Sequence, residues 1–311
     1  MATATATRGG LTATSPAAVG RRGRGLLVGL AVALVMVLVW EGVKFLGGTP
    51  WRAPLAQPGS PILWNPPFRW AFANDLNLPH VWNILLTFGE PFQRGADRSV
   101  AQFLFDAAVY TWREAAIGFV IGALIGLVLA TLFVHSRLLE RALVPYVVAS
   151  QTVPIIALAP LIVFAFGANV MSVVVIATYL TFFPVTIAMI RGLRSFDPRA
   201  LELMRSYAAT RTTIYRRLRL PASLPYLFTA LKIAATASVV GAIIGEGPGG
   251  IANGLGRVII TYNQYYITGP EKLWAAIIAS GLLGIAFYGL VALAEHYATS
   301  WHPSSRSFGG E

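Results

Sequence analysis

The chain contains no cysteine at any of its 311 positions. Disulfide bonds, thiol nucleophiles and cysteine-ligated metal sites are therefore excluded, and cysteine usage gives no indication of the compartment. The four histidines are scattered and lack the spacing of metal ligands. We therefore expect no metal and no other cofactor.

Charged residues are also scarce, at 12% of the chain against 56% hydrophobic residues, and the mean hydropathy is +0.64. Because a soluble domain carries about 25% charged residues, this composition predicts an integral membrane protein. The net charge of +11 would suggest a nucleic-acid partner in a soluble chain. Here the arginines lie at the ends of apolar runs, where membrane orientation and anionic lipid headgroups explain them better. We expect a lipid bilayer and no nucleic acid as partner.

Only three lysines are present, and none of them follows a glycine. A Walker A loop requires a glycine directly before its lysine, so the chain has no P-loop for ATP. The sequence also lacks G-x-S-x-G and H-E-x-x-H motifs, and it shows no pair of carboxylates inside an apolar run. We therefore expect no enzymatic activity, and any energy for transport must come from another polypeptide.

Long apolar runs dominate what is present. A helix needs about 20 mostly apolar residues to cross a bilayer, and the pattern predicts an all-α, polytopic bundle with six spans. Arginine is in excess on alternate connecting segments, which places both termini in the cytoplasm of a multi-pass cell-membrane protein. The predicted spans are 25–46, 107–134, 142–166, 170–190, 222–245 and 273–295.

The first span follows Arg21, Arg22 and Arg24, which resemble a twin-arginine signal, but no clear cleavage site follows, so a retained anchor is favoured. The Pro- and Trp-rich external segment is interpreted either as lying on the outer leaflet or as a plain loop. The predicted organisation is a disordered cytoplasmic tail at 1–24, the first span at 25–46, the external loop at 47–106, a helical core at 107–298 and a cytoplasmic tail at 299–311.

Small residues recur at four-residue spacing in the second span, at Gly118, Gly122 and Gly126 with Ala130 next. Such a stripe lets two membrane helices approach closely.

Four ionisable residues fall in or beside the spans. Lys232 is expected to snorkel to the cytoplasmic surface or to contact another subunit. Arg113 and Glu114 are expected to anchor the outer interface. Glu246 opens a glycine-rich external turn that is either an outer gate or a plain loop.

Polar residues inside the predicted spans are candidates for lining a passage, and interhelical hydrogen bonds are the alternative reading. Together with Glu246, they are Gln151, Thr152, Asn169, Thr178, Thr181, Thr236 and Ser238.

The segment 191–221 is a basic island, with eight arginines against Asp197 and Glu202. Its apolar spacing predicts two short amphipathic helices, at about 198–209 and 212–220, joined by a bend. This segment is interpreted as a surface for a cytoplasmic partner; the alternative is a segment that rests on the inner leaflet.

The same segment resembles the cytoplasmic signature of the membrane-spanning subunits of binding-protein-dependent ABC importers, E-A-A-x3-G-x9-I-x-L-P. Glu202, Leu220 and Pro221 match, and Leu218 is a conservative change. Ala208 stands at the glycine position and accepts a positive φ poorly, so the bend is expected to be helical or to move by one residue. The resemblance implies ATPase-coupling residues at Glu202, Leu203, Met204, Ala208, Ile214, Leu218, Leu220 and Pro221.

The resemblance implies a type I importer permease with coupling helices at 198–220. Its implied partners are a P-loop ATPase, an extracytoplasmic solute-binding protein and a second permease copy in a homodimer. T-W-R-E-A-A-I-G-F and F-F-P look like the sulfonate, nitrate, taurine and thiamine-precursor branch, and 245–274 is similar to riboflavin-import permeases.

Riboflavin or a related vitamin precursor is the expected substrate, with nitrate, sulfonate or taurine as the alternative. An ion-coupled secondary transporter is the second reading, although no inverted repeat is found. A membrane-embedded enzyme is the third.

Overall fold

The computed structural model describes residues 17–53, 60–93, 95–247 and 251–299. Within these residues all regular structure is helical, apart from three isolated bridges. The first helix already begins at Ala17, inside the segment 1–24 for which disorder was expected, and residues 1–16 lie outside the described part. So does almost all of the predicted tail 299–311.

Five helices in the described part are long and apolar enough to cross a membrane. A sixth crossing is formed by two shorter helices, α4 (Arg137–Ser150) and α5 (Ile155–Phe166), which are bent by 98° against each other. The all-α polytopic fold is therefore confirmed. The five long helices are α1 (Ala17–Leu46), α3 (Val100–His135), α6 (Val170–Gly192), α9 (Leu220–Glu246) and α11 (Pro270–Ala298).

The prediction of one continuous span at 142–166 was wrong, because the chain leaves the helix between Ser150 and Ile155. Pro154 has no N–H to continue the hydrogen-bond ladder, and it disfavours helical geometry at Val153. Pro154 instead precedes the first residue of α5 in extended conformation, at φ −63° and ψ 112°.

The centre of the bundle is the contact between α3 and α6, and the predicted glycine stripe forms it. A Cβ added at Gly118 would lie 2.4 Å from the Ala177 Cβ, and one at Gly122 would lie 2.6 Å from the Thr181 Cβ. Because the contacting residue numbers rise together, α3 and α6 run parallel. The bent α4–α5 pair must therefore carry the chain back across the bundle between them.

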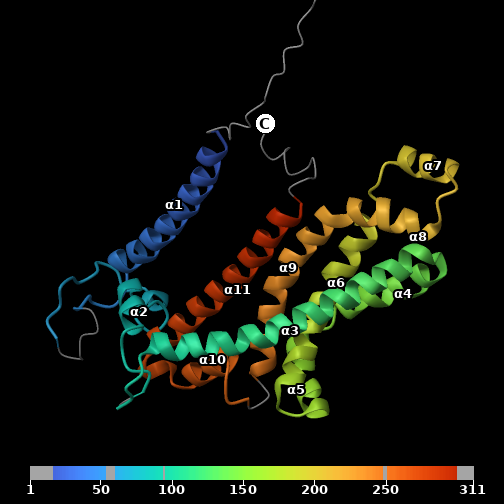
Figure 1. The fold of residues 1–311 in the computed structure, drawn as a ribbon. Helices are drawn as coiled ribbons and strands as arrows, with labels where there is room; N and C mark the ends of the chain where they lie inside the picture. Colours follow the sequence, from blue (N-terminus) through green and yellow to red (C-terminus); the bar gives the residue numbers. More distant parts are fainter. Residues whose placement is uncertain (1–16, 54–59, 94, 248–250, 300–311) are drawn as a thin grey trace, which may run out of the picture.

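Helix α9 packs antiparallel to α6 and also contacts α3. Gly192 lies against Tyr226 at one end of this contact, and Gly245 lies against Val173 at the other. Successive crossings therefore alternate in direction. In Figure 1 the helices α7 and α8 lie at one end of the bundle, whereas α5 and α10 lie at the opposite end.

Helix α1 stands apart from the other long helices over most of its length (Figure 1), and only 6% of its apolar window is buried. Its last turns are fixed by the segment that follows. The Lys44 ammonium is fully buried and lies 2.5 Å from the Asp75 carboxylate, and Trp40 donates to the Pro79 carbonyl at 2.9 Å. Part of the predicted loop 47–106 is therefore an ordered cap that contains α2 (Val81–Thr87).

A further helix, α10 (Leu255–Gln264), lies in the stretch between α9 and α11, where the sequence predicted only a glycine-rich turn and loop. It packs against α9, α11 and α3. This end of the bundle is consequently closed by packed helices.

Candidate functional site

The basic island forms two helices that project from one end of the bundle. The first is α7 (Pro198–Ser206), whose start follows from its sequence. The Asp197 carboxylate accepts the Arg199 N–H at 2.9 Å, and Pro198 occupies a first-turn position where no N–H is required. The predicted first amphipathic helix therefore exists, although it ends three residues earlier than expected.

The bend after α7 lies at Ala208, which adopts a left-handed conformation with φ 53°. Both expectations for this position, a helical bend and a bend moved by one residue, were wrong. The Ala208 N–H bonds to the Arg205 carbonyl at 2.9 Å, and the Ala209 N–H bonds to the Met204 carbonyl at 3.0 Å. These bonds close the last turn of α7 and hold alanine in a geometry that glycine adopts more readily.

The second helix continues without a break into the membrane. Helix α8 (Arg211–Ile214), capped by Thr210, passes through the π-helical turn η2 (Tyr215–Arg219) into α9. Pro221 cannot donate to the carbonyl four residues earlier, and the wider π turn accommodates that gap. Helix α8 is therefore continuous with α9, which packs on α6 and α11.

The two helices present different faces from those the sequence suggested. Leu203 and Tyr207, one turn apart, are 58% and 80% exposed, and Glu202 beside them is exposed. Ile214, a predicted coupling residue, lines a hollow on the side of the bundle together with Leu201. Tyr207 was not among the predicted coupling residues, because the importer signature specifies no residue at this position. The remaining predicted coupling residues Met204, Leu218, Leu220 and Pro221 are half-buried, and Ala208 is exposed.

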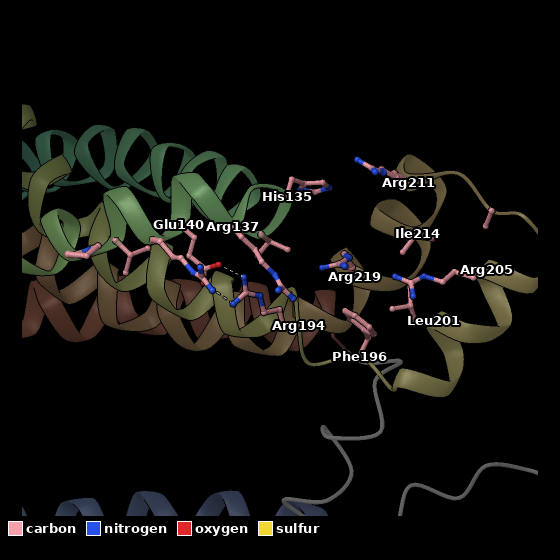
Figure 2. Close-up of a pocket in the computed structure, with 15 residues that line it drawn as sticks. His135, Arg137, Glu140, Arg194, Phe196, Leu201, Arg205, Arg211, Ile214 and Arg219 are labelled. Carbon is pink, nitrogen blue, oxygen red and sulfur yellow. Dashed lines mark hydrogen bonds and ion pairs between the residues drawn. The ribbon is translucent and has the colours of Figure 1, made fainter.

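This hollow has a volume of about 1230 Å³ and separates α7 and α8 from the ends of α3 and α4. Figure 2 shows basic side chains approaching it from both sides. Glu140 is its single acidic lining residue, and its carboxylate accepts from both terminal nitrogens of Arg194, at 2.8 and 2.6 Å. The arginines that line the hollow are Arg137, Arg141, Arg194, Arg205, Arg211 and Arg219.

Two contacts lie at the base of the projecting segment. The Tyr215 hydroxyl lies 2.9 Å from the Thr131 hydroxyl of α3. The Arg219 guanidinium lies 4.9 Å from the centre of the Phe196 ring. These contacts hold the base of the segment, while α7 is left free on its outer face.

The structure disperses the polar residues that were candidates for a passage. Thr178 and Thr181 lie in the α3–α6 contact, where their hydroxyls donate to the backbone carbonyls of Gly118 and Ala177. Ser238 is buried and donates to the Ala235 carbonyl at 2.8 Å. Only the Thr178 bond is the interhelical hydrogen bond that was the alternative, because the bonds of Thr181 and Ser238 stay within their own helices.

The other candidates lie nearer the surface. Asn169 caps α6, since its side-chain oxygen accepts the Met171 N–H at 2.8 Å. Gln151 is half-buried and Thr152 exposed at the α4–α5 bend, whereas Thr236 lies between the exposed residues Ile233 and Val240 of α9. Gln151, Thr152 and Thr236 therefore remain candidates for a passage between subunits.

Lys232 has a partner within its own chain. Its ammonium lies 2.7 Å from the Glu295 carboxylate of α11, and the two side chains are 21% and 25% exposed. The expected snorkelling or intersubunit contact is replaced by an ion pair that ties α9 to α11.

The fold and the site together define a polytopic helical membrane protein whose basic two-helix projection is continuous with a spanning helix. Within that class, residues 122–296 match the family of binding-protein-dependent transport system inner membrane components, and the chain belongs to this family. It is the permease subunit of an ABC importer. This finding sets aside the secondary-transporter and membrane-enzyme readings.

Relatives carry different substrate names. The formylaminopyrimidine transport permease protein ThiX of Halalkalibacterium halodurans is 36% identical over 191 residues, which are 60% of this chain and 73% of that protein. The riboflavin transport system permease protein RibX of Chloroflexus aurantiacus is 32% identical over 170 residues, 55% of this chain and 62% of that protein. Among solved structures, an amino acid ABC transporter matches 63% of this chain and 94% of its own, with a TM-score of 0.49 and 20% identity.

Proposed function

We propose that α7 is the docking element for a separate ATPase subunit, and that α8 and α9 transmit its movement into the membrane. The observation that supports this most strongly is the exposed apolar pair Leu203 and Tyr207 on a helix joined through α8 to a spanning helix. An amphipathic helix with apolar side chains one turn apart is suited to binding in a groove of a partner. The chain itself has no P-loop.

A charge placed on the docking face tests this proposal. Leu203→Asp puts a carboxylate where the partner's groove must bury it without a counter-charge, which is strongly unfavourable. We expect loss of ATPase co-purification and of transport, with normal membrane insertion. Thr212→Asp, at an exposed position of α8 away from this face, is the control. Normal transport by stably expressed Leu203→Asp would contradict the docking role.

The substrate we propose is a flat heteroaromatic vitamin or vitamin precursor, with riboflavin as the first compound to test. The support is the identity of 36% and 32% with relatives named for formylaminopyrimidine and riboflavin transport. Nitrate, sulfonate or taurine is the alternative, since relatives named for aliphatic sulfonates and nitrate share 26% identity.

Growth assays that depend on uptake distinguish the vitamin precursors from the alternative substrates. Expressed with its ATPase and binding protein, the permease should restore growth of a flavin auxotroph on low riboflavin or of a thiamine auxotroph on formylaminopyrimidine. Growth on a sulfonate as sulfur source, without rescue of either auxotroph, would favour the alternative.

We further propose that two copies of the chain enclose the passage. An extracytoplasmic binding protein delivers the solute to this passage. Supporting this, α5 packs little against its own chain, and its Phe164, Leu161 and Ile156 side chains are 90%, 63% and 69% exposed. Because the chain has no cysteine, a single Phe164→Cys variant can be cross-linked. A covalent dimer in membranes is expected, whereas a cysteine at the lipid-exposed Leu34 of α1 serves as the control.

A further inference from the structure

Two carboxyl groups lie buried where α3, α9 and α10 meet, at the end of the bundle opposite α7. Glu114 of α3 is 2% exposed, and Glu246 at the end of α9 is fully buried. The two carboxyls face each other within interaction distance. Glu114 was expected to anchor the outer interface, and it is instead buried against Glu246. This pair of carboxyls within the helices was not predicted.

The surroundings of Glu246 hold it as a hydrogen-bond acceptor. Its Oε2 accepts the Gly256 N–H at 2.6 Å, in the first turn of α10. The N-terminus of a helix stabilises a negative charge. Gly254 approaches so closely that an added Cβ would lie 2.3 Å from the Glu246 carboxyl carbon. The second oxygen, Oε1, has no hydrogen-bond partner among the residues that the structure describes.

In the described part of the chain, neither oxygen of Glu114 has a partner that meets hydrogen-bond geometry, and the Tyr110 hydroxyl lies close enough to interact with this carboxyl. The nearby Thr111 hydroxyl is already occupied, because it accepts the Leu255 N–H at 2.8 Å and donates to the Ala107 carbonyl at 3.1 Å. The other titratable groups that act on this site are Tyr110 and, through Tyr110, the exposed Arg113, both on α3. None of the ion pairs in the described part of the chain includes either glutamate.

Two ionised carboxylates at this site would be buried without a counter-charge and would repel each other. One proton between them removes the repulsion and one of the two buried charges. A metal ion requires about six or more oxygen ligands when it is magnesium or calcium. The described side chains offer two carboxyls and an occupied threonine hydroxyl, which is too few.

We infer that Glu114 and Glu246 form a proton-binding site, in which one proton is shared as a carboxylic acid–carboxylate pair. Glu114 carries the proton and donates its O–H to Oε1 of Glu246, whose Oε2 keeps the Gly256 N–H. Both oxygens of Glu246 then accept a hydrogen bond, and the site carries one negative charge. The bond joins α3 to the turn between α9 and α10.

A shared proton at this site predicts that the thermal stability of the protein depends on pH. In the purified full-length protein, the Tm of the wild type should fall as the medium is taken from mildly acidic to alkaline, because loss of the proton leaves two adjacent buried charges. Glu114→Gln keeps a donor, its amide, at the same place and carries no titrating proton. Its Tm should therefore lack this fall and exceed that of the wild type at alkaline pH.

The exposed Asp97 provides the matched control, since Asp97→Asn removes one carboxylate elsewhere and should retain the wild-type profile. Parallel profiles for Glu114→Gln and the wild type would overturn the inference. So would a rise in wild-type Tm on adding sodium, potassium or calcium that is absent from Glu114→Gln, because the site would then hold a metal ion.

Infrared spectroscopy of protein carrying ¹³C-labelled glutamate gives a second readout that needs no variant. The wild type at neutral pH should show the carbonyl stretch of a protonated carboxylic acid, shifted by the label. Absence of this band overturns the inference even if Glu114→Gln fails to fold. Loss of the band in folded Glu114→Gln supports it.

Discussion

Replacing Gly122 by alanine perturbs the close contact between α3 and α6 by a single methyl group. The added Cβ would lie 2.6 Å from the Thr181 Cβ, 2.8 Å from the Thr178 carbonyl oxygen and 2.9 Å from the Thr181 Cγ2. Two of these atoms are backbone or Cβ atoms of α6, so a side-chain rotation cannot relieve the clash. The two helices must move apart.

Two opposing effects set the size of the change. Overpacking of this kind costs about 1–3 kcal/mol, whereas alanine is favoured over glycine inside a helix by about 1 kcal/mol. Gly281 of α11 separates them, because a Cβ there meets nothing within 4 Å. Gly281→Ala therefore receives the helical gain alone.

The free energy of unfolding of both variants should be measured by denaturant titration in mixed micelles. We expect Gly122→Ala to be less stable than Gly281→Ala by about 1–3 kcal/mol, the overpacking cost alone. Equal stability of the two variants would refute the parallel α3–α6 contact as the tightly packed centre of the fold.

Three further outcomes are expected. Lys232→Met should destabilise the protein by roughly 1 kcal/mol, because it leaves a half-buried Glu295 carboxylate unpaired. Adding Glu295→Met should restore stability. Equal losses of stability in the single and double variants would contradict the ion pair. Ala208→Gly should preserve transport and raise stability by up to about 1 kcal/mol by relieving the positive φ, and a loss of stability would contradict that conformation. Single cysteines should react with an impermeant maleimide from outside the cell at two of four positions, and labelling of Ser206→Cys from outside would contradict the topology. The reactive positions are Ser60 and Asn253, and the protected positions are Ser136 and Ser206.

The sequence predicted the features that depend on neighbouring residues along one helix. Apolar length gave the crossings, and the four-residue spacing from Gly118 to Gly126 gave the close helix contact. Asp197 and Pro198 marked the start of α7. Each of these signals is local, so one chain is enough to interpret it.

The features that were missed depend on how helices pack in three dimensions. Glu114 and Glu246 meet because α3 packs against α9 and because α10 returns against both helices. The left-handed Ala208 is stabilised by bonds that close α7, which overcome its own preference. The exposed position of Tyr207 follows from the direction in which α7 leaves the bundle, and no local pattern gives that direction.

The central claim is that the outer face of α7 contacts the ATPase. A Tyr207→Cys permease should be co-expressed with ATPase variants that carry single cysteines along the proposed groove, and cross-linked with a short bifunctional maleimide in membranes. We expect a covalent permease–ATPase product from Tyr207→Cys. We expect none from Arg257→Cys, because Arg257 lies at the opposite end of the bundle. Absence of a product across the ATPase series, or an equal yield from Arg257→Cys, would contradict it.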